Sequence, residues 1–125
     1  MQLDKLCVAC FSPTHTSMKI ARAIADGTHI ARREEIDLTT DPADTPIAVR
    51  NAIRIVAAPV YGGLVAPVAV RRIARLRAEN SIAIPVVVYG NRDYEDALVQ
   101  LRDLLYAQGF TPLCGAAFVG EHSYS

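Results

Sequence analysis

The sequence predicts an α/β fold with an open, doubly wound sheet of five parallel strands, and three observations lead to it. Apolar runs of strand length alternate along the chain with segments whose apolar residues recur at helical spacing. Each such helix must return the chain to the same sheet, which makes neighbouring strands parallel. The 125 residues contain neither an internal repeat nor an interdomain linker, so residues 1–125 are expected to form one domain.

Each element follows from its local pattern. Strands are expected at 4–11, 29–38, 52–60, 82–90 and about 112–119. Helices are expected at 14–26, within the arginine-rich segment 66–80, and at 94–109. The second strand carries charged residues in its middle, which suits a sheet edge. The connection before the third strand contains two prolines and is expected on the surface.

The two longer helices show apolar stripes and glycine stops. Ile20, Ala21 and Ile24 share one face of the first helix, which is expected to end at Gly27. The last helix is expected to end at Gly109, and its stripe consists of Ala97, Leu98, Leu101, Leu104 and Leu105. The sequence stops after the fifth strand, where this architecture normally adds a helix. A partly bare sheet face would then favour a homodimer, or indicate a chain cut from something longer.

Composition excludes several classes of protein. Thirteen basic residues balance thirteen acidic ones, so no overall field attracts nucleic acid or an anionic membrane. No apolar run approaches the roughly 18 residues that a membrane helix needs, and no signal peptide is recognisable. We therefore expect a cytoplasmic protein. Four arginines, Arg71, Arg72, Arg75 and Arg77, favour a solvated helix face over a docking patch for an acidic partner.

The cysteines do not suggest a disulfide or metal site. Their number is three, and Cys7 and Cys10 form a C-x-x-C spacing that is typical of redox and metal motifs. Both lie in the first predicted strand, where side chains three positions apart point to opposite faces. We expect them to be small apolar groups of the core.

The turn after the first strand contains an unusual number of hydroxyl groups. The stretch "SPTHTS" at 12–17 contributes Ser12, Thr14, Thr16 and Ser17 at the start of a helix. A helix start has unpaired N–H groups and a positive dipole end, and hydroxyl groups add further donors for a phosphate. One hydroxyl is enough for a helix cap. Four of them favour a phosphate site.

Other phosphate-binding motifs are absent from the sequence. Neither GxxxxGK[ST] nor GxGxxG occurs. A phosphatase loop of the form C-x5-R beginning at Cys10 would need arginine at position 16, which is Thr16. A phosphate-accepting receiver domain would need acidic residues where this chain has Phe11, Ser12 and Pro13.

The "SPTHTS" turn resembles the phosphate loop of the flavodoxin family, [ST]-x-T-x-[ST]-[ST]. The resemblance implies FMN as cofactor, with its phosphate held by Ser12, Thr14, Thr16 and Ser17. The chain departs from the family at His15, which either contacts the phosphate or faces solvent.

The later turns also resemble those of flavodoxins, in "PVYGG" and "VYGNRDYEDAL". Tyr61 and Tyr94 would stack on the two faces of the flavin; each tyrosine alone would more often be a half-buried packing residue, but together with the hydroxyl-rich turn they favour stacking. Gly62 and Gly63 either form a simple tight turn or permit a peptide flip toward N5 of the reduced flavin. The cofactor-binding residues that the resemblance implies in these two turns are Pro59, Val60, Tyr61, Gly62, Gly63, Tyr89, Gly90, Asn91, Arg92 and Tyr94.

The ending "GAAFVGEHSYS" is similar to the flavodoxin-like domain of bacterial flavodoxin–ferredoxin fusion proteins. It would bring Glu121 and His122 near the flavin, unless the terminus is frayed. The cysteines that a ferredoxin domain requires are absent here. The resemblance implies an electron carrier that works with a redox partner protein, which would be of the ferredoxin type. A flavin-dependent reductase acting on NAD(P)H or quinone, and a cofactor-free interaction module, remain alternatives.

Overall fold

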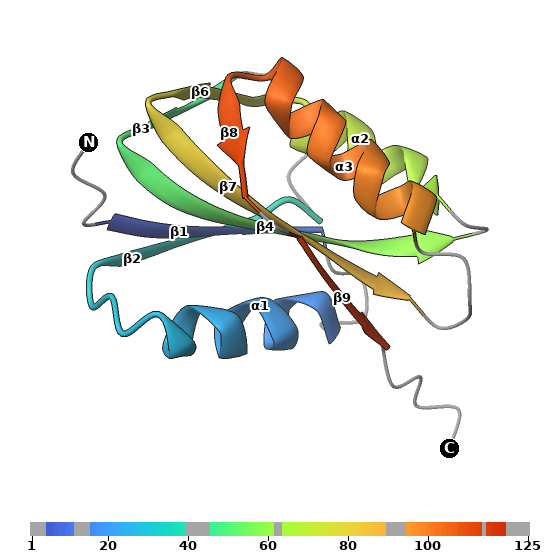
Figure 1. Cartoon of the computed structure of the whole chain (residues 1–125), viewed down its shortest axis with the longest axis horizontal. Helices are drawn as coiled ribbons and strands as arrows, with labels where there is room; N and C mark the ends of the chain where they lie inside the picture. Colours follow the sequence, from blue (N-terminus) through green and yellow to red (C-terminus); the bar gives the residue numbers. More distant parts are fainter. Residues whose placement is uncertain are drawn as a thin grey trace.

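A mainly parallel sheet runs through the middle of the molecule, and helices lie on both of its faces (Figure 1). The computed structural model describes residues 5–11, 16–39, 46–61, 64–89, 95–113 and 115–119. The strands are β1 (Lys5–Cys10), β2 (Arg33–Asp37), β3 (Ile47–Arg50), β4 (Ala52–Tyr61), β5 (Leu64–Val65), β6 (Leu76–Glu79), β7 (Ser81–Tyr89), β8 (Phe110–Pro112) and β9 (Ala116–Val119). The helices are α1 (Thr16–Gly27), α2 (Pro67–Ile73) and α3 (Glu95–Ala107). None of these helices is long and apolar enough to cross a membrane.

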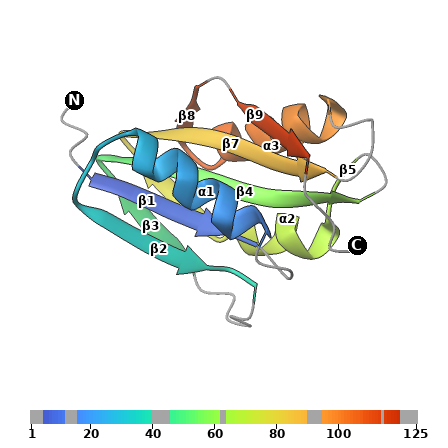
Figure 2. The same cartoon turned by 90° about the horizontal axis from the view of Figure 1, so that it is seen from below.

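The main sheet has the strand order β2-β1-β4-β7-β8. All of these neighbours pair in parallel, which confirms the predicted doubly wound class. The predicted count of five strands is wrong, because β5 adds an antiparallel pair at the end of β4 and the fifth strand is split. Its two pieces, β8 and β9, follow one another along β7 (Figure 2). The first piece ends at Pro112, and the Leu113 N–H that follows still donates a hydrogen bond of 2.8 Å to the Ala83 carbonyl group.

The strands at the centre of the sheet are buried on both faces, as their apolar sequences require. On one face Val56 and Val87 pack with Leu101 and Phe110, beneath α2 and α3. On the other face Leu6, Val8, Ile55 and Val86 pack against Met18, Ala21 and Ala25 of α1. Cys7 belongs to the first cluster and Cys10 to the second, which confirms that the two thiols diverge. Burial raises the pKa of the Cys10 thiol to about 12.

The two longer helices form near their predicted positions. On α3, Ala97, Leu101 and Leu105 are fully buried, and Gly109 follows with a φ of 99°. A Cβ at Gly109 would lie 2.3 Å from the carbonyl oxygen of Ala78, so only glycine fits there. On α1, Gly27 is the last helical residue, which confirms the predicted stop. The left-handed residue after the helix is His29, with a φ of 58°.

Two regions predicted as a connection and as part of a helix instead form a second sheet. β3 and β6 pair in parallel, whereas 39–51 was expected to be a surface connection and 66–80 to be helical. Helix α2 ends at Ile73, and the chain is extended again from Leu76. Arginine, alanine and glutamate favour a helix locally, but pairing with β3 overrides that preference.

Each strand of the small sheet joins the main sheet through a single asparagine. Asn51 separates β3 from β4, and Asn80 separates β6 from β7; each has a φ of 51°. The Asn80 Nδ2 group donates a hydrogen bond of 2.7 Å to Asn51 Oδ1. Asparagine tolerates this left-handed conformation better than most residues. The similar stretches "NAIRI" and "NSIAI" were the sequence signal for these paired kinks.

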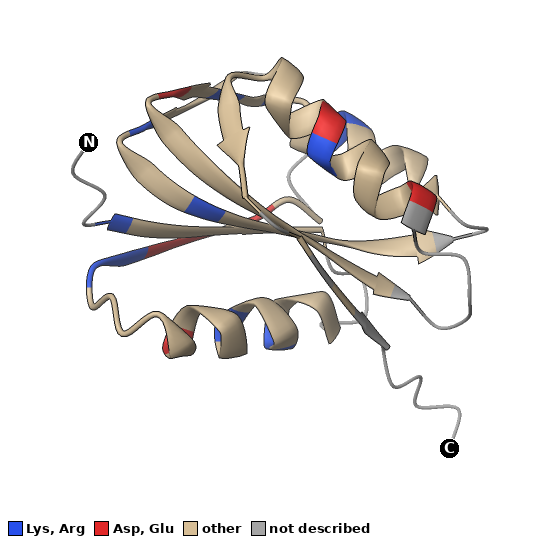
Figure 3. Cartoon of the chain, in the orientation of Figure 1, with Lys and Arg blue, Asp and Glu red and all other residues tan. Residues whose placement is uncertain are grey.

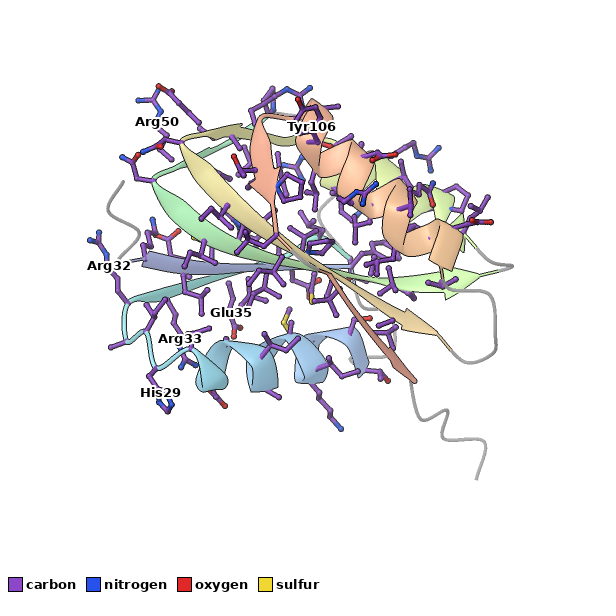
Figure 4. All side chains as sticks on the ribbon, in the orientation of Figure 1. His29, Arg32, Arg33, Glu35, Arg50 and Tyr106 are labelled. Atoms are coloured by element: carbon purple, nitrogen blue, oxygen red, sulfur yellow. The ribbon has the colours of Figure 1, made fainter. Side chains whose placement is uncertain are left out.

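Most charged residues of the described segments lie toward the periphery of the fold (Figure 3). β2 lies at the sheet edge as predicted, and its Arg33 and Glu35 point to the α1 side (Figure 4). Glu35 accepts two hydrogen bonds of 2.9 Å from Arg22 of α1. The arginine cluster does not form one solvated face. Arg75 is buried, and Arg72 donates to the carbonyl groups of Leu38 and Thr39 at 2.7 and 3.0 Å.

Substitution of Asn51 tests the kink. Asn51→Val should lower the free energy of unfolding by about 2 kcal/mol, because a β-branched residue resists a positive φ. Asn51→Gly keeps the conformation accessible and should cost about 1 kcal/mol or less through the lost amide contact. Urea denaturation of both variants measures the difference. Equal losses would show that the backbone conformation is not what selects asparagine.

Candidate functional site

The predicted binding turns follow strands whose carboxyl ends meet at one edge of the sheet. The turn after β1 begins at residue 12, and those after β4, β7 and β9 begin at residues 62, 90 and 120. These strands run in parallel, so the four turns all leave the same edge. Strand order reverses between β1 and β4, since β2 lies on the far side of β1. In open α/β sheets, ligands bind beside such a reversal.

This edge of the sheet is stepped. Cys10, the last residue of β1, pairs with Ala57, whereas β4 continues to Tyr61. Tyr89 ends β7 opposite Val119 of β9. The four residues by which β4 passes β1 correspond to roughly 13 Å of extended chain. Figure 1 shows β4 and β7 reaching beyond the end of β1, where the chain turns back into α1.

Helix α1 starts at the lower level of this step. Thr16 is its first residue and is partly exposed, while Ser17 is only 3% exposed. The first turn contains no acidic side chain, so the positive end of the helix dipole is not neutralised from within the helix. The other predicted phosphate ligands, Ser12, Thr14 and His15, lie outside the described residues.

The upper level of the step is held by a short hairpin. β4 and β5 pair in antiparallel, with Val60 opposite Val65 and Tyr61 opposite Leu64. Only Gly62 and Gly63 separate the paired Tyr61 and Leu64, and both glycines lie outside the described residues. Pro59 accepts a hydrogen bond of 3.3 Å from the Ala66 N–H. Pro59 and Val60 are half-buried at the base of the hairpin.

A contact from α3, which no sequence pattern indicated, fixes this hairpin. The Val65 N–H donates a hydrogen bond of 2.9 Å to Gln100 Oε1. An isolated glutamine on a helix is usually a solvated surface residue, so nothing in the pattern singled out Gln100. It anchors the strand that follows the glycine pair.

The third turn and the chain end are bounded by described elements. β7 ends at Tyr89, and α3 begins at Glu95. The residues predicted between and beyond these elements, Gly90, Asn91, Arg92, Tyr94, Glu121 and His122, lie outside the described residues. Their flanking strands place the start of each segment at the stepped edge. In the described part of the chain, no group of three or more His, Cys, Asp or Glu side chains could hold a metal ion.

Solved structures with the same arrangement identify the fold. An NADH:FMN oxidoreductase (EmoB, apo form) superposes with a TM-score of 0.70 at 17% identity, over 90% of this chain and 75% of the other. The Fusobacterium nucleatum flavodoxin bound to flavin mononucleotide gives 0.63 at 10% identity, over 87% and 68%. The chain has a flavodoxin-like fold. This fold accounts for the strand order and for the switch point between β1 and β4.

The flavodoxin-like fold also occurs inside a larger enzyme. The rubredoxin oxygen:oxidoreductase of Desulfovibrio gigas matches with a TM-score of 0.69 at 16% identity, over 98% of this chain but only 32% of the enzyme. No family model and no curated protein matches the sequence. The specific likeness to flavodoxin–ferredoxin fusions therefore stays a prediction.

Removal of the Gln100 anchor should loosen the hairpin selectively. Gln100→Ala should speed hydrogen exchange at the Val65 amide, because that N–H then loses its acceptor. Hydrogen exchange followed by NMR measures the effect, with Arg102→Ala on the exposed side of α3 as the matched control. Unchanged exchange at Val65 would contradict the anchoring role.

Proposed function

We propose that this protein binds FMN noncovalently at the stepped edge and carries electrons between redox partner proteins. The observation that carries this proposal is the step itself. It sets a hydroxyl-rich helix start below the protruding ends of β4 and β7, at the switch point of a flavodoxin-like sheet. A nucleotide with a phosphate at one end and a flat ring at the other suits two levels of this kind.

The lower level suits the phosphate. Ser12, Thr14, Thr16 and Ser17 supply hydroxyl donors beside the N–H groups at the start of α1. Because the first turn of α1 has no carboxylate, a phosphate dianion meets no repulsion from the helix itself. The donor set therefore fits a phosphate without any lysine. His15 would add a fifth polar group if its ring faces inward.

The upper level suits the flavin ring. In our proposal Tyr61 and Tyr94 stack on its two faces, and Asn91 and Arg92 contact its pyrimidine edge. Gly62 and Gly63 allow the backbone to approach the ring, and Glu121 and His122 close the far side. The bound FMN would supply one-electron and two-electron transfer, while the chain positions the ring and limits its contact with water. Gln100 holds Val65, the second residue after the glycine pair, through a hydrogen bond to its N–H.

A partner protein would reach the flavin at the same edge. The chain has no net formal charge, so its overall field does not steer a charged partner from a distance. We therefore expect contacts close to the flavin to decide which ferredoxin-type carrier docks.

A flavin-dependent reductase is the second candidate. The similarity to an NADH:FMN oxidoreductase supports it, although that likeness at 17% identity concerns the fold. A reductase would leave one flavin face open for its substrate, whereas a carrier would cover both faces with tyrosines.

The phosphate contacts can be tested with two ligands. The double substitution Thr14→Ala and Thr16→Ala should weaken FMN about 100-fold, because two charge-assisted hydrogen bonds are lost. Riboflavin lacks the phosphate and should bind within about twofold of wild type. Quenching of flavin fluorescence measures both affinities. Thr28→Ala, at the other end of α1, is the matched control.

Equal losses for FMN and riboflavin would contradict the phosphate assignment. A wild-type protein that stays colourless after FMN is added would contradict flavin binding altogether. It would instead favour a cofactor-free interaction module.

Carrier and reductase differ in how the bound flavin takes up electrons. We expect two separate one-electron steps in a potentiometric titration and no steady oxidation of NADH or NADPH by the holoprotein. Absorbance spectra recorded during reduction, together with an NAD(P)H consumption assay, give both readouts. Sustained NAD(P)H turnover would favour the reductase.

A further inference from the structure

A buried arginine lies at the opposite end of the sheet from the proposed flavin site. Arg54 belongs to the central strand β4 and is only 2% exposed. Its Nε and Nη1 atoms are buried and have no hydrogen-bond partner in the described part of the chain. Burial lowers the pKa of Arg54, since the charged form loses its hydration. A buried guanidinium without an acceptor is a strongly unfavourable arrangement.

The neighbours of Arg54 do not neutralise it. Glu34, Cys7 and Arg54 are register partners on three adjacent strands, and they share the face of the sheet away from α1. The two carboxylate oxygens of Glu34 are engaged elsewhere. Oε1 lies 2.6 Å from Lys5 Nζ, and Oε2 lies 3.9 Å from the Cys7 thiol.

Cys7 is not a counter-ion either. Burial raises the pKa of its thiol, so the group stays neutral at ordinary pH even though Arg54 acts in the opposite direction. On the other side of Arg54, the register partner is Ala83 of β7. Among the residues that the structure describes here, the group of Lys5, Glu34, Cys7 and Arg54 therefore has one positive charge in excess, which we assign to the buried guanidinium.

We propose that a small monovalent anion, of the chloride or bromide type, binds at the Arg54 guanidinium. The unpaired N–H groups supply donors, and the single excess charge matches a single negative charge. Ala52 and Ala83, both buried small side chains, flank Arg54 on the same face. The proposal is therefore restricted to a small ion that carries a single charge. The bound anion would neutralise the charge that β4 holds between β1 and β7.

Such an anion would stabilise the folded chain without touching the flavin. Because the anion would bind only the native state, the free energy of unfolding should rise with the anion concentration. Arg54 is the third residue of β4, whereas the flavin edge lies at the other end of that strand. A variant can therefore lose anion binding and still bind FMN, and failure of one proposal can be distinguished from failure of the other.

Denaturation in matched salts tests the proposal. The urea midpoint of wild type should rise with sodium chloride more than with sodium gluconate at equal ionic strength, because gluconate is too large to enter. Arg54→Met should abolish the difference, while Arg102→Met, an exposed arginine on α3, should preserve it. Measurements with saturating FMN exclude a contribution from the phosphate turn. An equal chloride response in Arg54→Met, or no chloride preference in wild type, would overturn the proposal.

A second pair of variants keeps Arg54 in place. Glu34→Gln removes the negative charge nearest the site and should tighten chloride binding several-fold. Glu35→Gln changes the next carboxylate on β2, which faces α1 and binds Arg22, and should have no effect. Crystals grown in sodium bromide should show an anomalous peak within hydrogen-bond distance of the Arg54 guanidinium. Weaker binding in Glu34→Gln, or a guanidinium hydrated by water in bromide, would contradict anion binding.

Discussion

Burial of both faces of the central strands is the constraint on which the rest of this structure depends. β1, β4 and β7 are apolar along most of their length, so each needs cover above and below the sheet. Helix α1 supplies it on one side, and α2 and α3 supply it on the other. Helical crossovers keep the strands parallel, and parallel strands send their carboxyl ends to one edge. Burial of the core therefore also brings the starts of the four predicted binding turns to one edge.

The carboxyl and amino edges of the main sheet differ in structure. At the carboxyl edge, strands of unequal length create the step in which we place FMN. At the amino edge, Ser81 Oγ accepts a hydrogen bond of 3.2 Å from the Ala52 N–H and donates one of 3.1 Å to the Glu79 carbonyl group. These bonds join the two asparagine kinks to the main sheet. Arg54 lies near this end, far from the proposed redox chemistry. In our proposal, FMN binding and the junction with the small sheet therefore lie at opposite ends of the same strands.

Most of the main sheet could be predicted from local pattern. The opposite faces of Cys7 and Cys10 followed from strand geometry, and the buried stripe of α3 followed from helical spacing. β6 could not be predicted in this way, because its residues favour a helix and only its distant partner β3 makes it a strand. The end of α1 at Gly27 was also predicted, whereas no local pattern indicated the left-handed conformation of His29 that follows it.

The candidate site was less predictable from the sequence than the main sheet was. Alternation of strands and helices correctly placed the four turns at one edge, because that result needs only chain direction. The Gln100 anchor and the unpaired Arg54 depend on contacts between elements far apart in sequence, so no local pattern could reveal them. The contacts of Tyr61, Tyr94 and the hydroxyl groups with FMN stay predictions that rest on the family resemblance.

The paired asparagines also make the molecule sensitive to chemical ageing. Hydrolysis of the Asn80 amide to a carboxylate would replace the donor that now faces Asn51 Oδ1 with a second acceptor. Two oxygens would then oppose each other where two strands leave the main sheet. Spontaneous damage to one side chain would thus weaken the junction between the small sheet and the main sheet, at the opposite end of β4 from the edge in which we place FMN.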